Sequence, residues 1–121
     1  MHDETHNPNR GLLAHRVALE GAALAIELAA GISAPLKSLA DQVIRSAASV
    51  PANLAEGTGR SGRDRKYHWR IAYGSALEVG SHLELLLRLG AVDAGQAHKA
   101  MKIFDRVRAL TWRLVHPRPK S

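Results

Sequence analysis

The chain has 121 residues, the size of a single domain, and 17 Lys+Arg against 11 Asp+Glu give it a formal net charge of +6, which favours anionic partners. Cysteine is absent, which excludes disulfide bonds and thiolate metal sites. Aromatic residues are few (Trp 2, Tyr 2, Phe 1), so alanine and leucine must fill the interior, a composition that suits packed helices better than a sheet sandwich.

The first ten residues are mostly polar and include Pro8, so residues 1–10 are expected to form a disordered arm. Their acidic start lacks the basic-then-apolar layout of a secretory signal. The most apolar run, residues 22–34, is shorter than a membrane span and is interrupted by Glu27. These features predict a cytoplasmic protein without a membrane role.

Glycine and proline divide the rest of the chain into helical segments. The first helix is expected over residues 12–30, stopping near Gly31. The second is expected to begin around Pro35, a favourable first helical residue, and to continue to Glu56, with Gly57 as its stop.

A third helix is expected after a short glycine-containing loop. Ser61, with Asp64 three residues later, resembles a capping box in which Asp replaces the usual Glu or Gln. This helix is expected to run to about Leu89 and to end at Gly90.

The fourth helix is expected to be capped by Asp93 and to reach about Val115, because two prolines beyond it forbid continuation. Residues 117–121 are expected to be a disordered basic tail, which leaves residues 11–116 as one domain. Short links between long helices imply antiparallel neighbours. The predicted fold class is therefore all-α, an antiparallel up-down four-helix bundle.

The helices differ in how their apolar residues are distributed. The second helix carries a single apolar stripe, whereas the first and third are apolar on more than one side. The residues concerned are Leu12, Val17, Leu19, Leu24, Ile26 and Leu28 in the first, and Leu83, Leu85, Leu86, Leu87 and Leu89 in the third. Such helices must be covered on more than one side, so we expect a homo-oligomer. The alternative is that these leucines only widen the internal core.

Pro51 lies inside the expected second helix. A proline there removes one backbone donor and crowds the carbonyl of Ala47, at a cost of about 3 kcal/mol. Ser49 and Asn53 are near enough to bond the disturbed backbone groups. Two interpretations stay open, namely a kinked continuous helix, or a helix end followed by a second short helix.

Cationic residues gather around the start of the third helix and along one side of the fourth. They are Arg60, Arg63, Arg65, Lys66 and Arg70, and then Lys99, Lys102, Arg106 and Arg113. Cations at a helix N-terminus oppose the macrodipole by about 0.3 to 1 kcal/mol each, so folding does not account well for the first group. Because guanidinium groups suit phosphate oxygens, we interpret these residues as candidate nucleic-acid contacts. The alternative is an ordinary solvated face.

Two aromatic residues are interleaved with the first cationic group. Tyr67 and Trp69 would be available to stack on unpaired bases. Burial in the core is the favoured alternative for Trp69, because it shares a helical face with Ala72, Ala76 and Val79.

No catalytic motif is evident in the sequence. Glu78 and His82 are four residues apart and could share a metal, but carboxylate-bridged bundles need a second such helix and further glutamates. There is no nucleophile elbow, phosphate-binding glycine loop or zinc motif. We therefore expect no enzymatic activity, no cofactor and no metal.

Two separated signatures carry a resemblance to a known family. They consist of Ser49, Pro51, Asn53, Ala55, Glu56, Gly57 and Arg60, and then Arg70, Ile71, Ala72, Gly74, Ser75 and Glu78. In this order they resemble the four-helix bundle family of 23S rRNA intervening-sequence proteins, which also contains the accessory (Avd-like) proteins of diversity-generating retroelements. The resemblance covers roughly residues 36–90, and the short, alanine-rich first helix departs from the family pattern.

The resemblance implies an antiparallel four-helix bundle that assembles as a cyclic homopentamer. It also implies partners, because the retroelement accessory members bind nucleic acid and a reverse transcriptase. We therefore expect a non-enzymatic oligomer that binds RNA or DNA through basic surfaces, as an accessory to a reverse transcriptase or a ribosomal RNA element. The alternative is a protein-interaction scaffold whose basic face meets an acidic partner.

Overall fold

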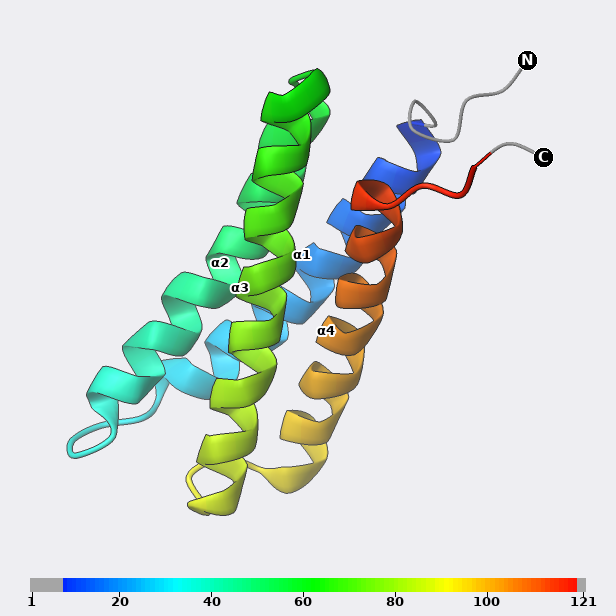
Figure 1. The fold of residues 1–121 in the computed structure, drawn as a ribbon. Helices are drawn as coiled ribbons and strands as arrows, with labels where there is room; N and C mark the ends of the chain where they lie inside the picture. Colours follow the sequence, from blue (N-terminus) through cyan, green and yellow to red (C-terminus); the bar gives the residue numbers. More distant parts are fainter. Residues whose placement is uncertain (1–7, 120–121) are drawn as a thin grey trace.

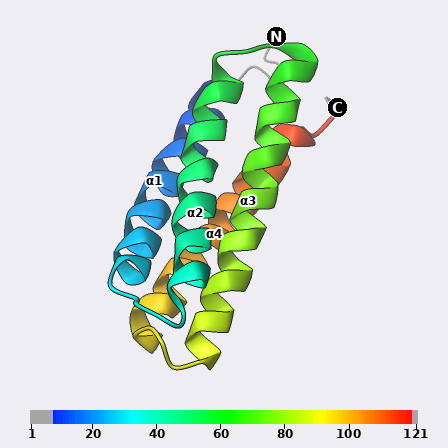
Figure 2. The same cartoon turned by 90° about the vertical axis from the view of Figure 1, so that its left-hand side faces the viewer.

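The computed structural model describes residues 8–119, and all the regular structure in that range is α-helical. Its helices are α1 (Pro8–Ala30), α2 (Lys37–Thr58), α3 (Gly62–Arg88) and α4 (Ala94–Val115), which pack as a bundle (Figure 1). Each helix packs on two others, in the order α1–α2–α3–α4 and back to α1. The start of α1, the end of α4 and the α2–α3 turn lie at one end of the bundle (Figures 1 and 2). The predicted all-α class and helical bundle are confirmed.

Small residues allow the helices to approach closely. On α1 the buried side chains are mainly alanines, namely Ala14, Ala18, Ala22, Ala25 and Ala29. A Cβ added at Gly21 would lie 2.9 Å from Ile103 Cγ2 and 3.2 Å from Phe104 Cε2. Phe104 and Leu54 are among the largest fully buried side chains. The core is thus built mainly from alanine, valine and leucine; the predicted alanine and leucine are there, but valines outnumber leucines among the buried residues.

The beginning of α1 differs from the sequence prediction. The helix starts at Pro8, so residues 8–10 are helical rather than part of a disordered arm. Proline suits this position because the first helical N–H has no intrahelical partner in any case. The remainder of the expected arm, residues 1–7, lies outside the described residues, as do residues 120–121 of the expected tail.

The boundaries of α2 also shift by two residues. It begins at Lys37 rather than at Pro35, because Pro35 lies in a turn in which the Leu36 N–H donates to the Ser33 carbonyl at 3.1 Å. It ends at Thr58, one residue beyond Gly57.

The central part of α2 runs without interruption through Pro51, which is buried. The interpretation of Pro51 as a helix end is therefore wrong. Asn53 Nδ2 donates to the Ser49 carbonyl at 3.0 Å, so a side chain does bond the backbone next to the proline. The helix that carries the first family signature is one continuous element.

The ends of α3 follow their predicted signals only in part. Ser61 has the extended backbone of a cap residue, but its side chain makes no capping hydrogen bond, so the predicted capping box is wrong. We attribute this to Gly62, whose φ of 58° turns the first residue of the helix away from right-handed geometry. At the other end, Gly90 has a φ of 70° and the Ala91 N–H donates to the Leu86 carbonyl at 3.0 Å, which is a Schellman stop.

The predicted cap of α4 is confirmed. A carboxylate oxygen of Asp93 accepts a hydrogen bond from the Gln96 N–H at 2.9 Å. The helix ends at Val115, as expected from the prolines that follow it.

The core takes up part of the apolar surplus of α1 and α3. Leu24, Ile26 and Leu28 pack against it, and Leu83 and Leu86 are buried in it. The leucines that face solvent on the described chain are Leu12, Leu19, Leu77, Leu85 and Leu89. Of the helices that the structure describes, none is both long and apolar enough to cross a membrane.

Candidate nucleic-acid interface

Three cations form an exposed row along the first turns of α3. Arg63, Lys66 and Arg70 are spaced by three and four residues, so they share one side of the helix. None of the three hydrogen-bonds or pairs with another described residue. With Asp64 and Tyr67 they line a surface hollow of about 730 Å³. We call these three residues the α3 cation row; Asp64 is the only carboxylate that lines the hollow with them.

The other two cations of this group bond within the molecule. Arg60 pairs with Glu56 over 2.9 Å at the surface. Arg65 donates from Nε to the Gly57 carbonyl at 3.1 Å and from Nη2 to the Thr58 carbonyl at 3.3 Å. Arg65 thus satisfies carbonyls at the end of α2, which makes it a structural link between α2 and α3.

The two aromatic residues of this segment have different environments. Trp69 is only 5% exposed, and a Cβ on Gly57 would overlap Cδ1 and Nε1 of its ring. The Arg65 guanidinium lies 5.5 Å from the centroid of the same ring. Trp69 is therefore a core residue, whereas Tyr67 is 60% exposed and is available to a ligand.

A polar network joins α2 to α3 next to this segment. Asn53 Nδ2 donates to the carbonyl and to Oγ of Ser49, both at 3.0 Å, and the Ser75 hydroxyl lies 3.0 Å from the same Oγ. Because the Ser49 carbonyl can only accept, the amide nitrogen of Asn53 must face it, which leaves Oδ1 facing His68. His68 Nδ1 lies 3.0 Å from this oxygen and therefore donates to it. The signature residues Ser49, Asn53 and Ser75 thus position α3, and with it the α3 cation row.

The structure does not bring all the cations of α4 to the α3 cation row. Lys99 and Lys102 lie near the start of α4, at the end of the bundle opposite to the α2–α3 turn (Figure 1). Both are exposed, as is Arg106, and none of them has a partner among residues 8–119. Arg113 is half-buried near the end of α4, and its Nε is buried without a hydrogen-bond partner among the described residues.

Sequence reasoning missed an exposed aromatic pair near the α3 cation row. Trp112 is 44% exposed and stacks on His116 with ring centroids 4.3 Å apart and an interplanar angle of 27°. Together with Arg70, Tyr73 and Val115 the pair lines a hollow of about 120 Å³ between α3 and α4. The spacing of four residues between Trp112 and His116 could have predicted that their rings meet. That Arg70 lies beside them could not be predicted in this way, because it depends on how α3 and α4 are aligned.

Neighbouring side chains on α3 and α4 hold one further arginine. Hydrogen bonding to Tyr73, and then to Asp105, raises the pKa of Arg108. Arg108 Nη2 lies 3.0 Å from the Asp105 carboxylate. This cation is neutralised by its partner, unlike those of the α3 cation row.

Metal-ligating side chains do not cluster in the described part of the chain. Among residues 8–119, no group of three or more His, Asp or Glu is placed to hold a metal ion. Glu78 Oε2 and His82 Nδ1 are 4.0 Å apart, which leaves them as a single pair.

Comparison with known families identifies the bundle. The family described as 23S rRNA-intervening sequence protein matches residues 17–113, a span that includes parts of all four helices. The chain belongs to this family. Neither this match nor the structural one below concerns a retroelement accessory protein, so that part of the resemblance stays a prediction.

A solved structure shares the fold of this intervening-sequence protein. It is a protein of unknown function from the S23 ribosomal protein family of Bacteroides thetaiotaomicron. The TM-score is 0.79 at 23% sequence identity, covering 88% of this chain and 98% of the other. At this identity the likeness shows the fold. No curated protein matches the chain.

Proposed function

We propose that this intervening-sequence protein is a non-enzymatic RNA- or DNA-binding protein whose exposed cations neutralise backbone phosphates. The observation that carries the proposal is the α3 cation row. Arg63 and Lys66 stand in the first turns of a helix, where cations oppose the macrodipole, and neither pairs with a described residue; Asp64 is the one carboxylate beside them in the hollow. A phosphate would do so, because guanidinium and ammonium groups both bind phosphate oxygens.

The proposal includes an antiparallel up-down order of the helices and a cyclic homo-oligomer, with the pentamer as the expected form. The exposed leucines on α1 and α3 support the assembly, because they leave apolar surface in water on two helices. An oligomer would repeat the α3 cation row in each subunit and so strengthen a weak contact by avidity. We further propose that it acts in the cytoplasm as an accessory to a reverse transcriptase or a ribosomal RNA element.

A protein-interaction scaffold is the second candidate function. It is favoured by a groove of about 550 Å³ between α3 and α4, which is lined by Leu77, Met101 and Phe104 among others. Its lining carries both signs of charge, with Lys102 and Glu84 beside the Arg108–Asp105 pair, so an amphipathic segment with an acidic group facing Lys102 is the partner that this candidate function would use.

The salt dependence of binding tests the nucleic-acid function. Each neutralised phosphate contributes about 0.9 to the log–log slope on duplex DNA and about 0.7 on single strands. Replacing Arg63, Lys66 and Arg70 together by alanine should therefore reduce the slope by about 2 to 3 units. Lys37→Ala is the matched control, because Lys37 is exposed but pairs with Asp41.

Two results would count against nucleic-acid binding. One is no binding of any RNA or DNA even at low salt, which favours the scaffold. The other is a slope that does not change in the triple variant, which would place the phosphate contacts elsewhere.

A further inference from the structure

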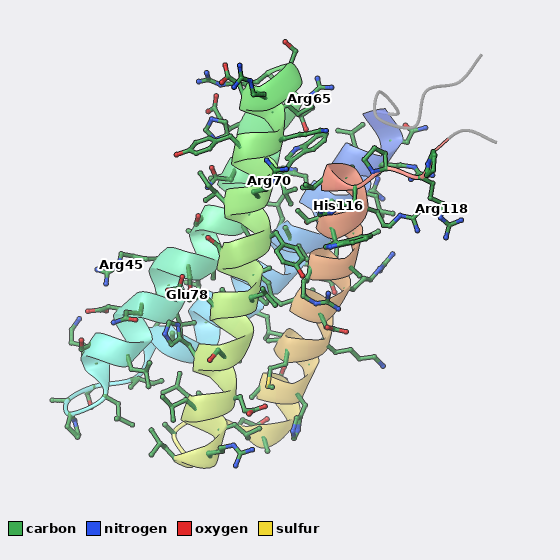
Figure 3. All side chains as sticks on the ribbon, viewed as in Figure 1. Arg45, Arg65, Arg70, Glu78, His116 and Arg118 are labelled. Carbon is green, nitrogen blue, oxygen red and sulfur yellow. The ribbon has the colours of Figure 1, made fainter. Side chains whose placement is uncertain are left out.

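The stacked pair of Trp112 and His116 presents an aromatic face to solvent. Trp112 is 44% exposed, whereas the other tryptophan, Trp69, is 5% exposed in the core. The hollow beside the pair is mainly apolar, and Arg70 is the cation on its rim. Figure 3 shows Arg70 on α3 and His116, just after the last residue of α4, in the same half of the molecule.

Arg70 connects this aromatic hollow to the α3 cation row. It lines the hollow that Trp112 and His116 form, and it also lines the one that contains Arg63, Lys66 and Tyr67. From Arg63 to Tyr73 the helix rises by about 15 Å. Cations and aromatic rings therefore alternate along one continuous track on α3 and the facing side of α4.

This alternation is the chemistry that single-stranded nucleic acid requires. Cations follow the phosphates, while exposed rings stack on bases regardless of sequence. In a duplex the base faces are already covered by neighbouring bases, so an aromatic ring on the protein surface would gain nothing from them. The cations of the track suit either form, but its rings suit only the unpaired one.

We propose that Trp112, held by its stack on His116, is the platform for an unpaired base of single-stranded RNA or DNA, and that Arg70 contacts a neighbouring phosphate. The inference rests on the proposed nucleic-acid function and deepens it. It selects single strands over duplexes, and it assigns the stacking to a residue of α4 rather than to Trp69.

The test compares oligo(U), oligo(dT) and a DNA duplex of equal length, with affinities measured by fluorescence anisotropy at low salt. Trp112→Ala should lower the affinity for both single strands about tenfold and leave duplex affinity unchanged. Trp112→Phe, which keeps an aromatic face, should retain most of the affinity. The two single-stranded probes distinguish RNA from DNA as the preferred ligand.

Intrinsic fluorescence gives an independent readout. Because Trp69 is buried, quenching by bound oligonucleotide should come from Trp112 and should disappear in Trp112→Phe. If Trp112→Ala does not fold, Trp112→Leu keeps an apolar contact with His116 while removing the aromatic face, and it should show the same tenfold loss.

Several outcomes would overturn the proposal. They are an unchanged affinity for single strands, an equal loss on the duplex, and a change of oligomeric mass in light scattering, which would make Trp112 a subunit contact. If the wild-type protein binds with a steep salt dependence and Trp112→Ala binds equally well, only the platform fails. If the wild-type protein binds no nucleic acid at low salt, the proposed function fails with it.

Discussion

Gly57 shows how one missing side chain sets the junction of α2 and α3. The space that its Cβ would need is occupied by the ring of Trp69. The guanidinium of Arg65 lies near the same ring and donates to the Gly57 carbonyl. The glycine, the ring and the guanidinium therefore depend on one another, and together they position the start of α3.

In Gly57→Ala the overlap with the Trp69 ring should cost about 1 to 3 kcal/mol, because the ring must shift in a packed core. The gain of about 1 kcal/mol that alanine brings to a helix offsets part of this cost, and because the added Cβ would overlap two ring atoms we expect a net loss of about 1 to 2 kcal/mol. Gly59→Ala is the matched control, since its Cβ would lie 3.7 Å from the nearest atom, the Glu56 carbonyl oxygen, and its φ of −79° suits alanine. Urea midpoints measure both variants, and equal midpoints would contradict the argument.

At the scale of the helices, cations two residues apart have different roles. Arg65 donates hydrogen bonds to two carbonyls at the end of α2. Arg63, two residues earlier on a different side of α3, has no partner among the described residues. Arg65 therefore supports the fold, and its guanidinium is already engaged by the carbonyls of α2. Arg63 is exposed and is available to a phosphate.

Substituting these two arginines should therefore separate stability from binding. Arg65→Ala should cost about 1 to 2 kcal/mol of unfolding free energy, because two charge-assisted hydrogen bonds are lost at a half-buried site, with little effect on the salt slope. Arg63→Ala should leave stability unchanged, or raise it by a few tenths of a kcal/mol since a cation leaves a helix N-terminus, and should reduce the slope. Thermal melts and salt titrations measure both, and similar profiles for the two variants would contradict the division.

These elements also show what local sequence signals can predict. Gly90 and Asp93 mark a helix stop and a helix start through bonds within a few residues, and both predictions are confirmed. The role of Arg65 was not predictable in this way, because its acceptors lie seven and eight residues back on another helix. The meeting of Arg70 with Trp112 likewise depends on how α3 and α4 are aligned.

For the whole molecule, the exposed leucines have an arrangement that bears on assembly. Leu12 and Leu19 are on α1, while Leu77 and Leu85 are on α3 and Leu89 follows its last residue. Since the helices pack in the order α1–α2–α3–α4, α1 and α3 are diagonal to each other. Two different apolar faces on opposite corners favour head-to-tail contacts, which close into a ring when the rotation permits.

This geometry predicts how single variants behave. The wild-type protein should have the mass of a closed ring, about 65 kDa for five chains of 13.1 kDa. Leu19→Glu or Leu85→Glu should each give monomers, because every contact in a ring uses one α1 face and one α3 face. Glu20→Gln, next to Leu19 on the exposed side of α1, should leave the mass unchanged.

Mixing the two variants distinguishes a ring from a two-fold dimer. Leu19→Glu retains an intact α3 face and Leu85→Glu an intact α1 face, so an equimolar mixture should form one contact and give a 1:1 dimer of about 26 kDa, twice the chain mass of 13.1 kDa. If one face paired with its own copy in a two-fold dimer instead, the variant that keeps this face would dimerise alone, and mixing would add nothing. Light scattering at micromolar protein concentration measures these masses. A monomeric wild-type protein at that concentration would contradict the proposed oligomer.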